Sequence, residues 1–119
     1  MSRILLVDDD PGVRFAWEHV LFDAGHQVDT AESVEAGCQL IALHNYALVI
    51  ADGRLSDGTG MMVADAAHEK GIPAMIVTGY AFSLHEAGVD LAQYDVLLKP
   101  IRPSELLEAV ERLLGAAEY

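Results

Sequence analysis

The chain has 119 residues, of which 52% are hydrophobic and 22% are charged, so we expect one globular domain spanning residues 1–119. Nineteen acidic residues against seven basic ones give a net charge of −12, which argues against nucleic-acid binding and favours cationic partners or metal ions. The single cysteine, Cys38, excludes an intramolecular disulfide, and no apolar run approaches the ~20 residues of a membrane span. We therefore expect a cytoplasmic protein that does not bind membranes.

Strand and helix patterns alternate along the whole chain. Continuous apolar or β-rich runs predict five strands, at residues 4–7, 27–30, 47–51, 73–77 and 94–98. Amphipathic patterns with start and stop residues predict helices at 11–24 and 33–44, from 58 or 59 to 71, at 82–92, and at 103–115. Strands that alternate with helices imply right-handed crossovers and a parallel sheet covered by helices on both faces.

The first helix illustrates these signals. Asp10 followed by Pro11 is a typical N-cap with proline in the first turn, and Gly25 is a plausible stop. Trp17 lies on the apolar face of this helix and is predicted to be a core residue.

Polar side chains stand directly after four of the strands. Because the carboxyl ends of parallel strands meet in one crevice, these side chains are expected to lie together. They are Asp8, Asp9 and Asp10 after the first strand, Asp52 after the third, Thr78 after the fourth and Lys99 after the fifth. Carboxylates beside an ammonium and a hydroxyl suit a magnesium ion and a phosphoryl group.

In this order and spacing, the four segments resemble the receiver domain of two-component response regulators, over nearly the whole chain. Asp8-Asp9 resembles the paired acids of the family, and residues 52–60 resemble its phosphoacceptor turn. Thr78-Gly79 resembles its switch hydroxyl and small neighbour, and Lys99-Pro100 its lysine with a proline whose peptide bond is usually cis. The resemblance implies a flavodoxin-like doubly wound α/β fold, (βα)5, with a five-stranded parallel sheet in the order 2-1-3-4-5.

The resemblance also implies a role for each site residue. Asp52 would accept a phosphoryl group from a histidine kinase or a histidine phosphotransfer protein. Mg²⁺ would be bound by Asp9, Asp52 and the backbone carbonyl of Arg54, with Asp8 acting through water. Lys99 and Thr78 would bind the phosphoryl oxygens. Such a domain promotes its own phosphorylation and loses the group slowly, so we do not class it as an enzyme.

The sequence departs from the family pattern on the output side. Val96 stands three residues before Lys99, where the family commonly has tyrosine or phenylalanine, and the nearest aromatic residue is Tyr94. Either Tyr94 takes this role or the signal runs through backbone rearrangement of residues 79–95. Arg54 and Tyr80, two residues beyond the phosphoacceptor and the switch hydroxyl, are large and are expected to shield the phosphorylated aspartate from water.

Several interpretations stay open at this point. The leading one is a stand-alone receiver that signals to a downstream protein through the face around residues 79–115, with phosphorylation-dependent homodimerisation undecided. The alternatives are a degenerate receiver that binds partners without phosphorylation and a Mg²⁺-dependent aspartyl phosphohydrolase. Arg54 stands where many such hydrolases carry a second aspartate, which argues against the last reading. A flavin carrier of the same fold is disfavoured, because three carboxylates after the first strand would repel a phosphate.

Overall fold

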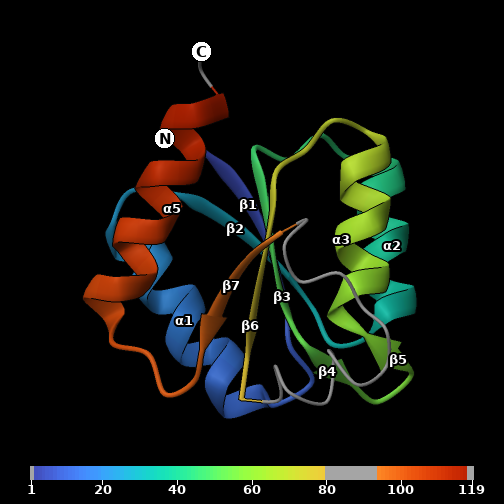
Figure 1. Cartoon of the computed structure of the whole chain (residues 1–119), viewed down its shortest axis with the longest axis horizontal. Coiled ribbons are helices and arrows are strands. Elements are labelled where there is room, and N and C mark those ends of the chain that lie inside the picture. Colours follow the sequence, from blue (N-terminus) through green and yellow to red (C-terminus); the bar gives the residue numbers. More distant parts are fainter. Residues whose placement is uncertain (1, 80–93, 118–119) are drawn as a thin grey trace.

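Five parallel strands form the central sheet of the computed structural model, which describes residues 2–79 and 94–117 (Figure 1). The sheet order is β2-β1-β3-β6-β7. The strands are β1 (Arg3–Val7), β2 (Gln27–Ala31), β3 (Leu48–Asp52), β6 (Ala74–Thr78) and β7 (Asp95–Leu98). Every pairing within this sheet is parallel. Counted along the chain, these strands have the predicted order 2-1-3-4-5, so the predicted fold class is confirmed.

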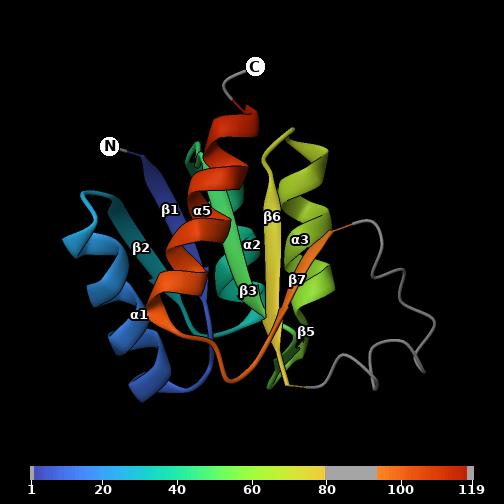
Figure 2. The same cartoon turned by 60° about the vertical axis from the view of Figure 1, so that its left-hand side comes forward.

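Helices cover both faces of the sheet (Figures 1 and 2). Helices α1 (Pro11–Asp23) and α5 (Pro103–Ala117) lie on one face, and α2 (Val34–Leu43) and α3 (Gly60–Glu69) lie on the other. The helix predicted over 82–92 falls outside the described residues. In the part of the chain that the structure describes, none of the helices has the length and apolar character needed to cross a bilayer.

The inner strands β1, β3 and β6 are almost entirely apolar because both of their faces are buried, whereas the edge strands β2 and β7 also carry polar residues. Alternate side chains of β1 point to opposite sides: Ile4 and Leu6 pack in the layer with α1 and α5, whereas Leu5 and Val7 pack in the layer with α2 and α3. This double burial holds the sheet rigid, so the residues that follow each strand are held in fixed relative positions.

Side-chain caps start the helices where the sequence predicted them. The carboxylate of Asp10 accepts hydrogen bonds from the backbone N–H groups of Gly12 and Val13, and Ser33 Oγ accepts one from Ala36. Trp17, predicted to be a core residue, is only partly buried at the edge of the α1–α5 layer. That prediction is therefore only partly correct, since the ring also faces the carboxyl ends of the strands.

A short antiparallel hairpin follows β3 and was not predicted. Its strands are β4 (Arg54–Leu55) and β5 (Gly58–Thr59). The turn between them carries Asp57, whose carboxylate accepts hydrogen bonds from the backbone N–H groups at the start of α2. The segment after Asp52 is thus a fixed structure docked on a helix.

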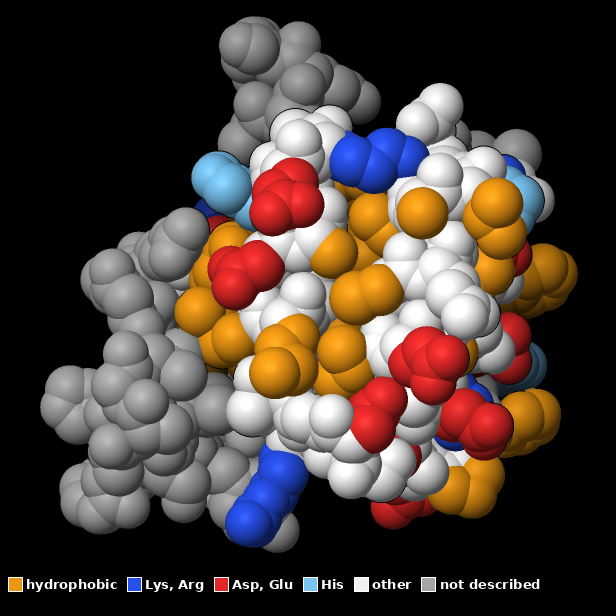
Figure 3. All heavy atoms as spheres, turned by 90° about the vertical axis from the view of Figure 1, so that its right-hand side faces the viewer, with side chains coloured by type: hydrophobic (Ala, Val, Ile, Leu, Met, Phe, Trp, Pro, Cys, Tyr) orange, Lys and Arg blue, Asp and Glu red, His pale blue; other side chains and the backbone are white. Residues whose placement is uncertain are grey.

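The outer face formed by α2 and α3 combines hydrophobic and acidic side chains (Figure 3). Leu43 on α2 and Met62 on α3 are among its exposed hydrophobic side chains. In this view acidic side chains lie at the upper left and the lower right of the hydrophobic ones, and Lys or Arg side chains lie at the top and the lower left. The acidic excess of the composition is therefore also present on this helical face, outside the crevice at the strand ends.

Candidate functional site

The register of the sheet brings the predicted site residues to one edge. Val7 pairs with Ala51, Asp52 pairs with Val77, and Thr78 pairs with Leu98. The residues that follow these positions therefore leave adjacent strands at the same level. The backbone N–H of Lys99 also donates a 3.0 Å hydrogen bond to the carbonyl of Thr78, which fixes the end of β7 beside β6. The peptide bond between Lys99 and Pro100 is cis.

Three carboxylates form an acid cluster, which we define as Asp8, Asp9 and Asp52. One oxygen from each lies within 4.8 Å of the others. Asp8 is 1% exposed, and burial raises the pKa of its carboxyl, with the nearby charge of Asp52 adding to this shift. Burial likewise raises the pKa of Asp52, although Lys99 and the backbone N–H of Arg54 oppose the shift. Such a cluster favours a bound cation, because a cation offsets both the repulsion and the lost hydration.

One oxygen of the cluster would suit a bound cation. Asp8 Oδ1 accepts a 2.9 Å hydrogen bond from the backbone N–H of Asp10, whereas Asp8 Oδ2 is buried without a hydrogen-bond partner among the described residues. A buried carboxylate oxygen without a donor is costly unless it binds an ion or ordered water. The donors are all carboxylate oxygens, which Mg²⁺ prefers to the nitrogen and sulfur ligands of softer metals. The residues present therefore fit Mg²⁺.

The acid cluster opens into a hollow of about 420 Å³. A water molecule occupies about 30 Å³ in the liquid, so this hollow has room for a hydrated ion and a phosphoryl group together. Its walls are Asp9, Asp10, Asp52, Arg54, Leu55, Ser56 and Lys99.

Lys99 places a positive charge beside the acid cluster. Its ammonium Nζ lies 3.5 Å from Asp52 Oδ2 and 3.7 Å from Asp8 Oδ2, and its side chain is 29% exposed. The ammonium thus reaches both the predicted phosphoacceptor and a predicted metal ligand. Arg14 adds a further contact that the sequence did not suggest, because its guanidinium donates a 2.8 Å hydrogen bond to the carbonyl of Asp8 and fixes the turn that carries the acids.

Two glycines make the turn after Asp52 possible, and their structural role was not predicted. A Cβ atom on Gly53 would lie 2.5 Å from Cβ and 2.6 Å from Oγ1 of Thr78, so only glycine allows β3 and β6 to end this close together. A Cβ on Gly60 would collide with the carbonyl of Asp52. The signal in the sequence that could have revealed this role was the position of the two glycines, Gly53 directly after β3 and Gly60 at the start of α3.

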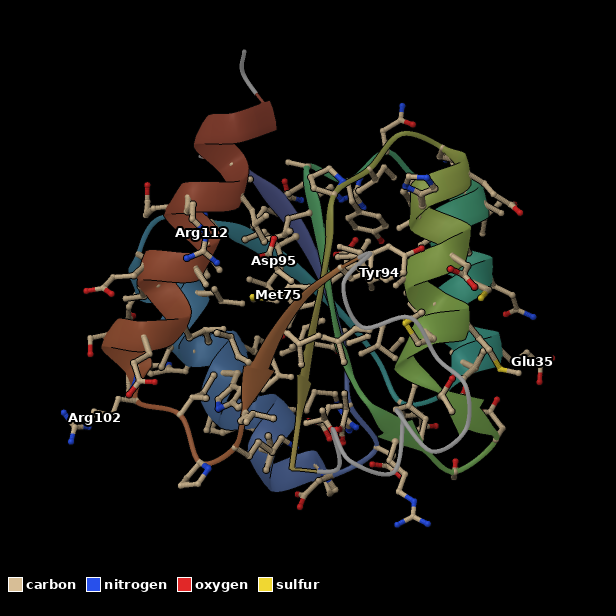
Figure 4. All side chains as sticks on the ribbon, viewed as in Figure 1. Glu35, Met75, Tyr94, Asp95, Arg102 and Arg112 are labelled. Atoms are coloured by element: carbon tan, nitrogen blue, oxygen red, sulfur yellow. The ribbon has the colours of Figure 1, made fainter. Side chains whose placement is uncertain are left out.

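Two of the predicted output residues, Tyr94 and Val96, lie away from the acid cluster. Tyr94 precedes β7, and its hydroxyl donates a 2.6 Å hydrogen bond to Asp65 on α3 (Figure 4). Because Asp95 pairs with Met75 while Leu98 pairs with Thr78, Tyr94 lies at the opposite end of the strand pair from Thr78. Val96 packs against the α2–α3 layer. Gly79 follows Thr78 at the carboxyl edge, and Tyr80 lies outside the described residues.

Comparison with known proteins identifies relatives of this chain. The family model of the response regulator receiver domain matches residues 4–111. The photosynthetic apparatus regulatory protein RegA of Rhodobacter capsulatus is 34% identical over 110 residues, covering 90% of this chain and 60% of RegA. The transcriptional regulatory protein GlrR of Escherichia coli is 31% identical over 117 residues, covering 95% of this chain and 26% of GlrR. The chain thus spans only part of the length of these relatives.

Solved structures give the same result. A CheY-like receiver domain protein from Methanospirillum hungatei superposes with a TM-score of 0.85 at 30% identity, covering 99% of this chain and 97% of that one. The response regulator TrrA from Thermotoga maritima, solved in complex with Mg²⁺ and BeF, superposes with a TM-score of 0.80 at 30% identity, covering 95% and 99% of the two chains. Fold, site geometry and relatives agree: the chain belongs to the response regulator receiver domain family.

Proposed function

We propose that the domain accepts a phosphoryl group on Asp52 in a Mg²⁺-dependent reaction and passes this signal to another protein. The observation that carries the proposal is the acid cluster itself. Its buried Asp8 Oδ2 has no hydrogen-bond partner among the described residues, and the Lys99 ammonium lies 3.5 Å from Asp52. The complex of the relative TrrA with Mg²⁺ and BeF supports the same chemistry.

In the proposed reaction, a carboxylate oxygen of Asp52 forms a bond to phosphorus. The bond between phosphorus and the donor nitrogen of a phosphohistidine breaks, and the electron pair stays on that imidazole nitrogen. The donor would be a histidine kinase or a histidine phosphotransfer protein. Because a carboxylate is a weak nucleophile and phosphorus is shielded by anionic oxygens, the chain's main contribution is positioning and neutralisation of charge.

Each site residue has a part in this step. Asp9, Asp52 and the backbone carbonyl of Arg54 would hold Mg²⁺, with Asp8 acting through water. When bound, Mg²⁺ supplies positive charge that offsets both the carboxylates and the phosphoryl oxygens. Lys99 would turn its ammonium from the carboxylates toward a phosphoryl oxygen. The hydroxyl of Thr78 would donate a hydrogen bond to another.

We also propose a comparatively long-lived acyl phosphate. Arg54 is exposed and lines the hollow beside Asp52, where its large side chain can exclude attacking water. Tyr80 is proposed to act from the other side. A half-life of only seconds in Mg²⁺ would contradict this part of the proposal. Slow loss of the group agrees with a signalling domain rather than an enzyme with turnover.

The partner on the output side is proposed to be a protein that contacts the face around residues 79–115. Because the net charge is −12, we do not expect this domain itself to contact nucleic acid, and we propose a cytoplasmic site of action. A role within transcriptional regulation is a second candidate, favoured by the similarity to the transcriptional regulatory protein GlrR, which is much longer than this chain. Phosphorylation-dependent homodimerisation would be one way to pass on the signal.

The experiment that tests the proposal is phosphorylation by a small donor. The protein is incubated with acetyl phosphate, with and without Mg²⁺, and its intact mass is measured beside Asp52→Asn and Asp23→Asn. Asp23 is a matched control, an exposed carboxylate on α1 paired only with His19 among the described residues. One adduct that needs Mg²⁺, persists in Asp23→Asn and is lost in Asp52→Asn supports the proposal.

The alternatives give different results in the same assay. A protein that binds Mg²⁺ and forms no adduct would contradict phosphorylation by a small donor and favour a phosphorylation-independent interaction module. Continuous release of phosphate from an added phosphomonoester would instead indicate the aspartyl phosphohydrolase.

A further inference from the structure

The single tryptophan of the chain lies against the cation of the site. Trp17 comes from α1, and the ammonium Nζ of Lys99 lies 5.6 Å from the centroid of its ring. The same ammonium is 3.5 Å from Asp52 and 3.7 Å from Asp8. Three groups therefore surround one cation, two carboxylates and the face of an aromatic ring.

The ring has a physical reason to hold the ammonium in place. Tryptophan has the strongest cation–π attraction of the aromatic residues, because the face of its ring carries negative potential. Lys99 is a long, flexible side chain and is 29% exposed, so solvent competes with the site for its ammonium. Trp17 also lines a mainly apolar hollow with Val13, Lys99, Pro100 and Ile101. The lysine thus leaves β7 between apolar side chains with its charge directed at Asp52.

A packing role alone would explain less of this arrangement. Trp17 does contact the α1–α5 layer of the core, yet it is only partly buried. A leucine at this position could fill the same edge of the core, since leucine supplies apolar surface without an aromatic face. Replacement by leucine therefore separates packing from attraction to the cation.

We propose that Trp17 is a positioning residue for phosphoryl transfer to Asp52 and that it acts through Lys99. The inference rests on the proposed phosphorylation of Asp52. Before transfer, the ring and the two carboxylates share the ammonium. During transfer, the ring keeps the ammonium at the mouth of the hollow, where the phosphoryl oxygens arrive. Without the ring, Lys99 spends more time turned toward solvent and the transfer slows.

The test compares initial phosphorylation rates with acetyl phosphate and Mg²⁺ in wild type, Trp17→Leu and Trp17→Phe. Loss of a partly exposed cation–π contact predicts a rate about three- to tenfold lower for Trp17→Leu, with Trp17→Phe in between because phenylalanine keeps a weaker π face. Phe15→Leu is the matched control, since it removes an aromatic side chain that is 72% exposed on the same helix. That control should keep the wild-type rate.

A double-mutant cycle shows whether Trp17 acts through Lys99. In a Lys99→Met background, Trp17→Leu should change the rate by less than about 1.5-fold, because the partner of the ring is already absent. An equal slowing in both backgrounds would mean that Trp17 only packs, and would overturn the inference. An unchanged rate for Trp17→Leu in the wild-type background would overturn it too.

Tryptophan fluorescence keeps this inference separate from the proposed function. Trp17 is the sole tryptophan, so emission in Mg²⁺-free buffer should differ between wild type and Lys99→Met if the ammonium contacts the ring. Identical spectra would overturn the inference even if phosphorylation occurs. A wild type that forms no adduct but shows the spectral difference would contradict the proposed function while supporting the contact.

Discussion

The backbone N–H of Val34 donates a 2.8 Å hydrogen bond to Oδ1 of Asp57, which lies in the turn of the β4–β5 hairpin. The neighbouring N–H of Glu35 donates to the other oxygen of the same carboxylate at 3.1 Å. One side chain thus caps α2 and anchors the segment that runs from Asp52 to α3. The hydrogen bond from Val34 lowers the pKa of Asp57 the most, and the hydrogen bond from Glu35 lowers it further.

Replacing Asp57 tests this anchor. Asp57→Ala should speed amide hydrogen exchange at Val34 and Glu35 and weaken Mg²⁺ binding, because the hairpin that carries Arg54 is then held only through β3 and α3. Hydrogen exchange followed by NMR and a Mg²⁺ titration measure the two effects. Glu108→Ala, which removes an exposed carboxylate on α5 away from the hollow, should alter neither.

The hydrogen bonds that Asp57 accepts from α2 are also predicted to weaken as the pH falls. Because the pKa of Asp57 is lowered in the folded protein, its contribution is present above the ordinary carboxyl value of 3.8 and is lost as the pH falls through the lower folded value. Protection of Val34 and Glu35 should therefore decrease in acid in wild type and stay constant in Asp57→Ala. Protection that rises on acidification would contradict this assignment.

Asp8→Asn should stabilise the protein in Mg²⁺-free buffer. Burial raises the pKa of Asp8, so the folded state binds its proton more tightly than the unfolded chain does, and the associated stability is lost as the pH rises through the folded value. At pH 7 the ionised carboxylate therefore destabilises the fold. We expect Asp8→Asn to raise the free energy of unfolding by about 1–2 kcal/mol, measured by urea denaturation. A less stable variant would mean that the ion pair with Lys99 outweighs burial.

Mg²⁺ should reverse the difference in the free energy of unfolding between wild type and Asp8→Asn. An ion that binds only the folded state stabilises it by about 2.7 kcal/mol at a hundred times its dissociation constant. Wild type should gain this stability on addition of Mg²⁺ and lose it with a chelator, whereas Asp9→Asn and Asp52→Asn should gain little. Equal stabilisation of all three proteins would show that the ion binds elsewhere on the acidic surface.

The edge where the site lies could be predicted from the residues themselves, because apolar runs ending in Asp8, Asp52, Thr78 and Lys99 depend only on local pattern. The sheet order was expected only from the resemblance to the receiver family, since local pattern does not fix which strands pair. The β4–β5 hairpin was missed because two-residue strands have no periodicity to detect. The contact of Trp17 with Lys99 was missed for another reason. It joins residues 17 and 99, and only the folded chain brings this side chain of α1 beside the residue that follows β7.

Tyr94 shows a limit of the same kind. Its nearness to Lys99 in sequence made it the candidate to replace the missing aromatic residue. However, the four residues of β7 separate Tyr94 from Lys99 along the strand direction. The register of β7 with β6 therefore places Tyr94 at the opposite end of the strand pair from Thr78. Distance along a strand cannot be read as contact before the register is known.

Gly53→Ala should disturb the hydroxyl of Thr78, which we propose to bind a phosphoryl oxygen. The new methyl group would lie 2.5–2.6 Å from the side chain of Thr78, which is completely buried and has little room to move. Overpacking of this kind costs about 1–3 kcal/mol of stability. Urea denaturation should show this loss, and phosphorylation should slow because the hydroxyl is displaced. Gly115→Ala is the control, since a methyl group there meets nothing within 4 Å.

Tyr94→Phe separates the hydroxyl of Tyr94 from signalling. The variant loses the hydrogen bond to Asp65 and with it about 0.5–1.5 kcal/mol of stability, while the ring keeps its edge contact with His68. Burial and the Asp65 hydrogen bond raise the pKa of Tyr94 to about 12, so the hydrogen bond persists throughout the neutral range.

Because Tyr94 and Thr78 lie at opposite ends of paired strands, phosphorylation and phosphorylation-dependent partner binding should stay unchanged in Tyr94→Phe. Tyr46→Phe, which removes a comparable hydrogen bond to Asp29, controls for stability. If Tyr94→Phe abolishes the dependence of partner binding on phosphorylation while Tyr46→Phe does not, Tyr94 belongs to the switch and signalling must cross the sheet from Thr78 to α3.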